Sequence, residues 1–130
     1  MPVELELALR LLLAAGLGAI IGFQRQRSGK PAGLRTNVLI AVGAALFAIT
    51  GEFSFSGGDP SRIAAGVVAG VGFLGAGAIL HRHGGIEGLT TAATIWVVAA
   101  IGLASGAGLY IIAPVATAIT FIILLLPHKD

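Results

Sequence analysis

The sequence contains no cysteine, which excludes disulfides, thiolate zinc sites, iron–sulfur clusters and a cysteine nucleophile. Charged residues are also scarce, at 11% of 130 residues, compared with about 25% in soluble proteins. So few charges cannot cover the surface of a water-soluble domain of this size. The basic residues form no water-facing surface with stacking aromatics, so we expect no nucleic-acid partner.

What the chain has instead is apolar sequence, at 56% of its residues, with a mean hydropathy of +0.97. A helix of about 20 apolar residues crosses the roughly 30 Å hydrocarbon core of a bilayer. We therefore predict an all-α membrane bundle that forms one transmembrane domain over residues 1–130, with the lipid bilayer as its surroundings. The predicted helices are at about 5–23, 35–52, 62–80, 89–105 and 108–126. The N-terminus lacks the features of a cleaved signal, so the first helix is expected to be retained.

The distribution of Lys and Arg predicts the orientation of these five helices. Positive loops stay in the cytoplasm, and two of the eight cations, Arg10 and Arg62, fall on one side. The other six share the opposite side: Arg25, Arg27, Lys30, Arg35, Arg82 and Lys129. We predict that the N-terminus lies outside and the C-terminus inside.

A short pattern recurs after 55 residues. Gly22 is followed at Gly33 by Gly-Leu-Arg-Thr, and Gly77 is followed at Gly88 by Gly-Leu-Thr-Thr. The pattern is open to two interpretations, a duplication that maps the first two helices onto the next two in the same direction, or repeated local chemistry. In the second, Thr36 and Thr90 or Thr91 cap the helices that follow.

Glycine is abundant in the predicted helix at 62–80, which contains Gly66, Gly70, Gly72, Gly75 and Gly77. Five glycines weaken a helix unless another backbone comes close. One interpretation is tight packing within the bundle or in a dimer, and the other is a glycine-lined path or a broken helix at a substrate site. Gly18 and Gly22 in the first helix form a similar pair.

Polar residues near the predicted outer side have two interpretations as well. Asp59 precedes Pro60 and Ser61, as a helix cap does, yet with Glu52 it could also face an external cation such as Mg²⁺, which keeps most of its waters. Arg10 is expected to pair with Glu6 and to extend toward the membrane surface. Pro114 is expected to kink the last helix or free a carbonyl group.

On the predicted inner side, the polar residues fit anchoring and contact with lipid phosphates. They are Gln24, Arg25, Gln26, Arg27, Lys30, Arg35, His81, Arg82, His83 and Glu87. His81 and His83 could bind a metal or respond to pH, but no Cys or clustered carboxylate accompanies them. The sequence has no Ser/His/Asp arrangement, so we expect no enzyme and no cofactor beyond an interaction with Mg²⁺.

Five stretches together resemble the MgtC/SapB family, specifically its N-terminal transmembrane domain. They are Lys30-Pro-Ala-Gly-Leu-Arg-Thr-Asn37, Gly43-Ala-Ala-Leu-Phe47, Asp59-Pro-Ser-Arg-Ile-Ala-Ala65, Gly70-Val-Gly-Phe-Leu-Gly-Ala-Gly77 and Gly88-Leu-Thr-Thr-Ala-Ala-Thr-Ile-Trp96. The resemblance implies a multi-pass protein of the bacterial inner membrane, linked in the family to magnesium homeostasis and to virulence. Motif and packing positions in this chain are Arg25, Gly33, Arg35, Thr36, Asn37, Asp59, Arg62, Gly66, Gly70, Gly72, Gly75, Gly77, Gly88, Thr90, Thr91 and Trp96.

Four positions depart from the pattern of that family: Gln24 replaces Glu, Gly66 replaces Gln, Glu87 replaces Arg and Thr90 replaces Asn. These changes weaken any mechanism that uses those polar groups. The chain also ends at Asp130, without the soluble C-terminal domain of longer members, so it resembles a minimal membrane core.

Three functional hypotheses follow from the sequence, of which the last is a purely structural role as a lipid or assembly factor. The first is a non-enzymatic modulator that acts through helix contacts, as a homo-oligomer or with another membrane protein, because close-packing glycines are abundant. The second is a small cation transporter or channel component for Mg²⁺, with Asp59 at its outer mouth.

Overall fold

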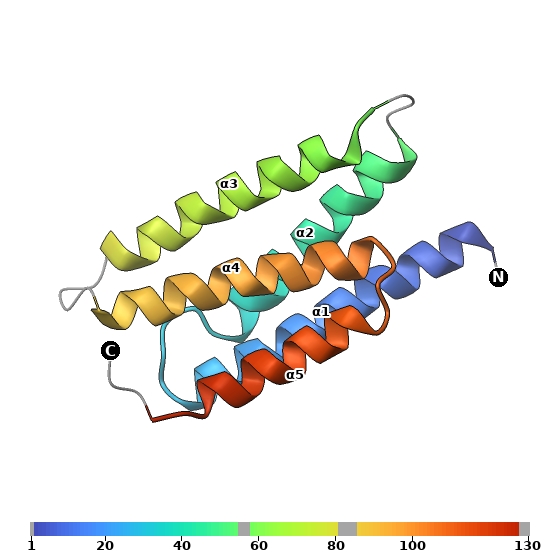
Figure 1. Ribbon diagram of the computed structural model, residues 1–130. Coiled ribbons are helices and arrows are strands. Elements are labelled where there is room, and N and C mark those ends of the chain that lie inside the picture. Colours follow the sequence, from blue (N-terminus) through green and yellow to red (C-terminus); the bar gives the residue numbers. More distant parts are fainter. Residues whose placement is uncertain (1, 55–57, 81–85, 128–130) are drawn as a thin grey trace.

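The computed structural model describes residues 2–54, 58–80 and 86–127, which form five α-helices (Figure 1). The all-α prediction is confirmed. The helices are α1 (Val3–Arg27), α2 (Leu34–Phe53), α3 (Pro60–Leu80), α4 (Ile86–Gly106) and α5 (Ile112–Leu124).

Consecutive helices run in opposite directions, so α1, α3 and α5 are parallel to one another and antiparallel to α2 and α4 (Figure 1). The start of α1 and the end of α5 therefore lie at opposite ends of the bundle, as five crossings require. The hairpin formed by α1 and α2 runs in the same direction as the hairpin formed by α3 and α4, which agrees with the sequence pattern that recurs after 55 residues. A gene duplication and the side that faces the cytoplasm stay predictions.

The centre of the bundle is the contact of α1, α2 and α4. Ala14, Ile21, Ala41, Ala45 and Val98 are fully buried there and form one apolar cluster. Helix α5 covers α1 and α4 on one side, while α3 contacts α2 and α4 on the other. Because the buried residues are mostly small, the helices approach one another closely.

Glycines in α1 and α4 permit this approach. A Cβ atom built on Gly18 would lie 2.8 Å from the Cβ of Ala41, and one on Gly22 would lie 2.8 Å from the Cα of Leu34. In α4, a Cβ on Gly102 would overlap the carbonyl oxygen of Ala41, and one on Gly106 would come within 2.5 Å of the Ala45 carbonyl oxygen. The predicted packing role of Gly18 and Gly22 is confirmed, and the Gly102/Gly106 pair, also spaced by four, was not predicted.

Four of the helices are long and apolar enough to cross a membrane, whereas α5 is shorter. Its 13 residues span about 20 Å at 1.5 Å per residue. The predicted start at residue 108 was too early, because Gly108 adopts a positive φ of 84° in the turn before the helix. Pro114 consequently lies in the first turn of α5, where a missing N–H costs little and gives no reason for a kink; the alternative, a freed carbonyl group, stays a prediction.

Both ends of α5 are nevertheless tied to α1. The Tyr110 hydroxyl donates to Glu6 Oε2 at 3.1 Å, and Gln24 Nε2 donates to the Leu124 carbonyl oxygen at 3.5 Å. Since Glu6 and Gln24 are separated by most of α1, the segment from Tyr110 to Leu124 runs along nearly the whole of that helix.

The start of α2 differs from the prediction. Thr36 was expected to cap this helix, but the helix begins at Leu34 and Thr36 lies inside it. Gln26 of α1 provides the cap instead, because its Oε1 accepts the Leu34 N–H at 3.1 Å. Helix α4 likewise begins at Ile86, so Thr90 and Thr91 lie beyond its first turn and the predicted capping role was wrong.

Candidate functional site

Arg10 is a buried cation at the end of the bundle where α1 begins. It is 9% exposed, and its guanidinium forms an ion pair of 2.7 Å with Glu6 and a longer one of 3.4 Å with Glu52 of α2. Its Nη1 also donates to the carbonyl oxygen of Gly106, at the end of α4, at 2.9 Å. One side chain therefore joins three helices, and the predicted pair with Glu6 is confirmed.

The turn between α4 and α5 explains why Arg10 is buried. At Gly108, a Cβ atom would lie 3.0 Å from the guanidinium carbon of Arg10, so the turn packs closely over the cation at a position without a side chain. The expectation that Arg10 simply extends to the membrane surface was therefore incomplete. It reaches toward that end but is enclosed by protein, with the Phe53 ring 5.9 Å from its guanidinium carbon.

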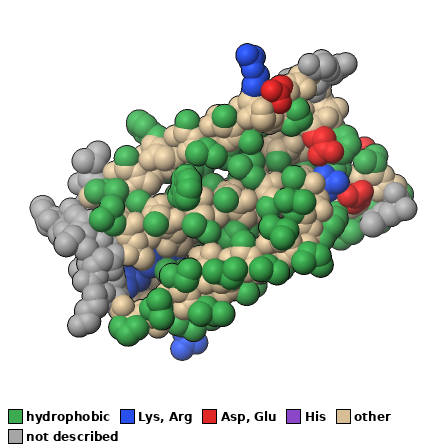
Figure 2. Space-filling view, in the orientation of Figure 1, with side chains coloured by type: hydrophobic (Ala, Val, Ile, Leu, Met, Phe, Trp, Pro, Cys, Tyr) green, Lys and Arg blue, Asp and Glu red, His purple; other side chains and the backbone are tan. Residues whose placement is uncertain are grey.

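Asp59 caps α3 at the same end of the molecule. Its Oδ1 accepts the backbone N–H of Ser61 at 3.0 Å and the Ser61 hydroxyl at 2.8 Å, which confirms the capping prediction. These two hydrogen bonds, the one from the hydroxyl first, lower the pKa of the exposed Asp59 carboxyl below its ordinary value. Figure 2 shows acidic side chains gathered at this end, while hydrophobic side chains are spread along the length of the visible surface.

These carboxylates do not converge on one point. Within residues 2–54, 58–80 and 86–127, no three His, Cys, Asp or Glu side chains come together as a metal site would require. Glu6 and Glu52 both contact Arg10, whereas Asp59 contacts Ser61. A metal role for Asp59 stays a prediction, and any ion held there would keep most of its waters.

Arg25 is the second buried cation, near the opposite end of α1. It is 4% exposed, and its Nη2 donates to the hydroxyl oxygen of Thr91 on α4 at 2.5 Å. Thr94 is also buried and donates to the Thr90 carbonyl oxygen one turn earlier. Arg25 and Thr91, named from separate sequence stretches, are thus brought into direct contact.

Asn37 shapes the loop before α2. Its side chain is fully buried, and its Nδ2 donates to the carbonyl oxygens of Ala32 and Gly33 at 2.7 and 2.9 Å. These bonds hold Ala32 at a φ of +56°, which a residue with a side chain rarely adopts. The motif at residues 30–37 therefore encodes a loop conformation.

The other motif residues are dispersed. Arg35 and Thr36 are exposed, Trp96 is 56% exposed on the outside of α4, and Gly33 meets the Gln26 side chain. Gly88 is buried. Some predictions concern positions that lie outside the described residues: His81, Arg82, His83, Lys129 and the side chain of Glu87.

Sequence reasoning missed the capping role of Gln26, the contact of Tyr110 with Glu6 and the Arg10–Glu52 contact. The four-residue spacing of Gly102 and Gly106 was a signal that could have placed α4 in the core. No comparable signal marked Gln26 or Tyr110, because their partners lie in other helices.

The glycines of α3 have a different environment from those of α1 and α4. Cβ atoms built on Gly66, Gly70, Gly72 and Gly77 would meet no described atom within 4 Å, and only Gly75 has a neighbour, Ala92, at 3.4 Å. Over an 18-residue window, 11% of α3 is buried, compared with 50% of α4. Of the two packing partners that the sequence left open, the bundle itself or a second copy, the described chain provides one only at Gly75; packing in a dimer and a glycine-lined path stay predictions.

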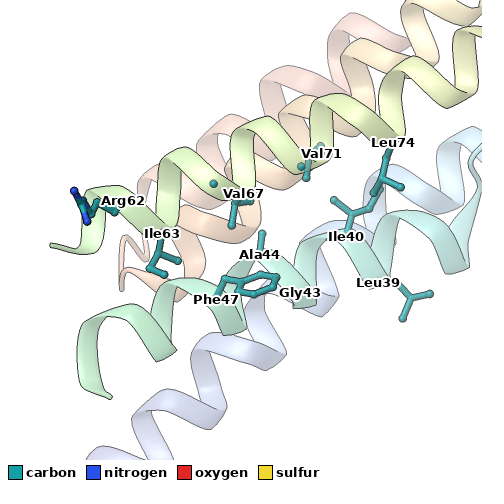
Figure 3. A pocket seen from close by; sticks show the side chains of 12 residues that line it. Leu39, Ile40, Gly43, Ala44, Phe47, Arg62, Ile63, Val67, Val71 and Leu74 are labelled. Carbon is teal, nitrogen blue, oxygen red and sulfur yellow. The ribbon is translucent and has the colours of Figure 1, made fainter. Parts of the chain in front are cut away.

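A groove of about 530 Å³ runs between α2 and α3. In Figure 3, Ile63 and Val67 of α3 point toward α2, Phe47 lies beside Gly43 on the opposite wall, and Arg62 lies at the end where α3 begins. The other lining residues are Leu39, Ile40, Ala44, Gly66, Gly70, Val71 and Leu74. Apart from Arg62, all of these side chains are apolar.

Comparisons with known proteins agree with these features. YhiD of Escherichia coli K12, a candidate magnesium transporter by name, is 50% identical over 132 residues, which cover 95% of this chain and 61% of the relative. Protein SrpB of Synechococcus elongatus is 47% identical over 92% of this chain and 74% of its own length. Protein MgtC of Brucella abortus is 50% identical over 78% of this chain and 42% of its own.

This chain thus spans about three fifths of the first of these relatives. No solved structure matches it. The sequence model of the MgtC family matches residues 11–129, which include the buried Arg25, the Asn37 loop and all of α3, while Arg10 lies just before the matched range. The chain, a multi-pass membrane protein by its apolar helices and its relatives, belongs to the MgtC family.

Proposed function

We propose that this chain is a non-enzymatic component of magnesium homeostasis in the bacterial inner membrane, acting through contacts between α3 and another membrane helix. The observation that carries the proposal is the open glycine surface of α3. We define the outward face of α3 as Gly66, Gly70, Phe73 and Gly77, which recur at intervals of three or four residues and therefore share one side of the helix. Phe73 is 81% exposed.

The energetics of glycine support a partner at this face. Each glycine in a helix costs about 1 kcal/mol relative to alanine in water and less in lipid. In α1 and α4 the cost is offset by close contacts with α2, but the outward face of α3 has no such contact within the described chain. Small residues at this spacing are typical of surfaces where membrane helices associate.

The packing of the core also favours a modulator over an ion pathway through one copy. Between Arg10 and Arg25, α1 buries Ala14, Leu17 and Ile21 against apolar residues of α2, α4 and α5. The buried hydroxyls of Ser105 and Thr117 donate to carbonyl oxygens of their own helices. These two hydroxyl groups are therefore engaged in hydrogen bonds within their own helices and do not form a polar path through the core.

A Mg²⁺ transporter or channel component is the second candidate. The name of YhiD favours it, and so does the gathering of Glu6, Glu52 and Asp59 at one end of the bundle. In this alternative, Asp59 faces the cation and an oligomer supplies the pathway.

The test compares Gly70→Leu and Gly77→Leu with Gly16→Leu. Gly16 lies in α1, and a Cβ there also meets nothing within 4 Å, so it is the matched control. Cells that depend on this protein for growth at low magnesium should fail to grow with either α3 variant, although both variants should accumulate and remain folded. Growth equal to that of Gly16→Leu would contradict the proposal.

Liposome flux separates the two candidates. Purified wild-type protein reconstituted in liposomes should produce no Mg²⁺ flux above that of empty vesicles. Protein-dependent flux that is abolished by Asp59→Asn would establish the transporter and overturn the modulator.

A further inference from the structure

The groove between α2 and α3 is lined almost entirely by apolar residues. Val67 and Val71 form part of its floor, because they are buried against Ala44 of α2 and Ile95 of α4. Phe47, which lies on the rim, is 58% exposed, so the groove opens away from the bundle. Leaving about 530 Å³ empty beside hydrocarbon would forfeit dispersion contacts along both walls.

The length of the groove matches one leaflet of a membrane. It extends along α3 from Arg62 to Leu74, which is about 18 Å at 1.5 Å per residue. Half of a bilayer's hydrocarbon core is about 15 Å thick. A single acyl chain that starts at the membrane surface near Arg62 would therefore reach the far end of the groove.

Arg62 supplies a charge at the surface end. It is exposed, and in the described part of the chain its guanidinium has no ion pair or side-chain hydrogen bond. Figure 3 shows its side chain pointing away from the apolar walls. The neighbouring Asp59 accepts two hydrogen bonds from Ser61 at Oδ1 and, among the residues that the structure describes, forms no ion pair with Arg62, so the guanidinium can bind a phosphate group, for which its geometry is suited.

A membrane helix fits the groove less well. With its side chains a helix is at least about 10 Å across, so a segment 18 Å long occupies roughly 1,400 Å³. The groove, which is open along one side, would enclose only part of such a helix, so a helix would rest largely on its rim. A phospholipid combines a slender apolar chain with an anionic phosphate and so matches both the walls and Arg62.

We propose that the α2–α3 groove binds a phospholipid, with one acyl chain between Phe47 and Val67 and the phosphate at Arg62. This site lies on the side of α3 that faces α2, whereas the proposed helix partner uses the outward face. Gly66 and Gly70 lie at the border of the two surfaces, and Gly77 does not line the groove. Lipid binding is therefore an inference that goes beyond the proposed function.

Native mass spectrometry of delipidated full-length protein tests the site. Palmitoyl-oleoyl phosphatidylglycerol, titrated into the protein in detergent, should give one high-affinity adduct per chain. Arg62→Gln should weaken that adduct about fivefold, the effect of one surface arginine near a lipid phosphate, and Arg62→Lys should retain most of it. Arg27→Gln, which removes an exposed cation at the other end of the bundle, should leave it unchanged.

Palmitoyl-oleoyl glycerol lacks the phosphate, so its binding measures the contribution of the apolar groove without that of the charge on Arg62. Its weaker binding should not change in Arg62→Gln. Gly43→Leu places a side chain in open space on the groove wall and should abolish binding of both lipids, while Gly16→Leu and Gly77→Leu should not affect it.

Equal phosphatidylglycerol affinity in wild type and Arg62→Gln would overturn the proposal, and that comparison does not depend on whether Gly43→Leu folds. A mass corresponding to two copies that excludes lipid and is lost in Gly43→Leu would show that a second chain occupies the groove, and would also overturn it. Loss of growth in Gly77→Leu with normal lipid binding would leave the proposed function standing independently.

Discussion

Helices α3 and α4 are neighbours of similar length and composition, yet they use glycine in opposite ways. In α4, Gly102 and Gly106 lie directly against the backbone of α2, and Val98 and Ile101 are almost completely buried. In α3, the glycines other than Gly75 meet open space. The difference shows that glycine content alone indicates a capacity for close approach, and that the neighbours decide whether this capacity stabilises the folded chain or remains available to a partner.

The strongest way to test this contrast is the same substitution in both helices. Gly102→Leu should prevent folding or reduce the free energy of unfolding by 3 kcal/mol or more, since overpacking typically costs about 1–3 kcal/mol and here the obstacle is the backbone of Ala41. Gly70→Leu should change it by less than about 1 kcal/mol. Denaturant unfolding of both variants in detergent measures the difference, and equal destabilisation would remove the contrast.

A substitution of Arg10 tests how much the contacts of its buried charge contribute to the stability of the α1–α2–α4 core. Arg10→Gln should destabilise the chain by about 2 kcal/mol. This is less than the roughly 3–5 kcal/mol for breaking a fully buried pair, because Glu6 and Glu52 are 34% and 44% exposed. The same unfolding measurement applies, with Arg27→Gln as a control at an exposed position. A change as small as that of the control would mean that the Arg10 contacts contribute no net stability.

A smaller effect is expected at the start of α2. Gln26→Ala removes the acceptor for the Leu34 N–H and should cost about 1 kcal/mol, the usual value of a helix cap. Gln26→Glu keeps an acceptor oxygen near the positive end of the helix and should restore the stability. Amide hydrogen exchange that becomes faster at Leu34, and only in the alanine variant, would show that the lost stability comes from this cap. Exchange that becomes faster by the same factor throughout α2 would contradict the capping role.

The smallest effect concerns Asp59 and pH. Because its pKa is lowered in the folded protein from an ordinary value of 3.8, the ionised cap stabilises the fold above that pH, and the contribution disappears as pH falls through the lower, folded value. Asp59→Asn retains a capping oxygen and should remove this acid-dependent step with little change at neutral pH. Unfolding measured between about pH 2 and 6 gives the comparison, and an unchanged acid dependence would assign the step to another carboxyl.

The apolar runs were sufficient to predict five helices, because length and hydrophobicity report the membrane directly. The Arg10–Glu6 pair and the Asp59 cap were predictable as well, since both partners are close in sequence. In contrast, Gln26 caps a helix other than its own, and Glu52 reaches Arg10 from 42 residues away. Sequence spacing could not identify these contacts, because they depend on how α1, α2 and α4 are placed relative to one another.

For α3, the sequence left open for a related reason whether its glycines pack within this chain or against a second one. Its glycine spacing correctly indicated a surface for close approach, but it could not reveal that this chain provides a neighbour only at Gly75. The groove could not be predicted either, since it arises from the way α2 and α3 diverge beyond the contact of Gly51 with Ile63.

The burial of Arg10 has a consequence for biosynthesis. Its acceptor at Gly106 is 96 residues later in the chain, and translation at about 5 to 20 residues per second separates the two by roughly 5 to 20 seconds. During that interval, of the partners Glu6, Glu52 and Gly106, only Glu6 and later Glu52 have been synthesised. The contacts of Arg10 are complete only when Gly106 and the α4–α5 turn have been made. A charge in the first helix is therefore enclosed only at a late stage of insertion.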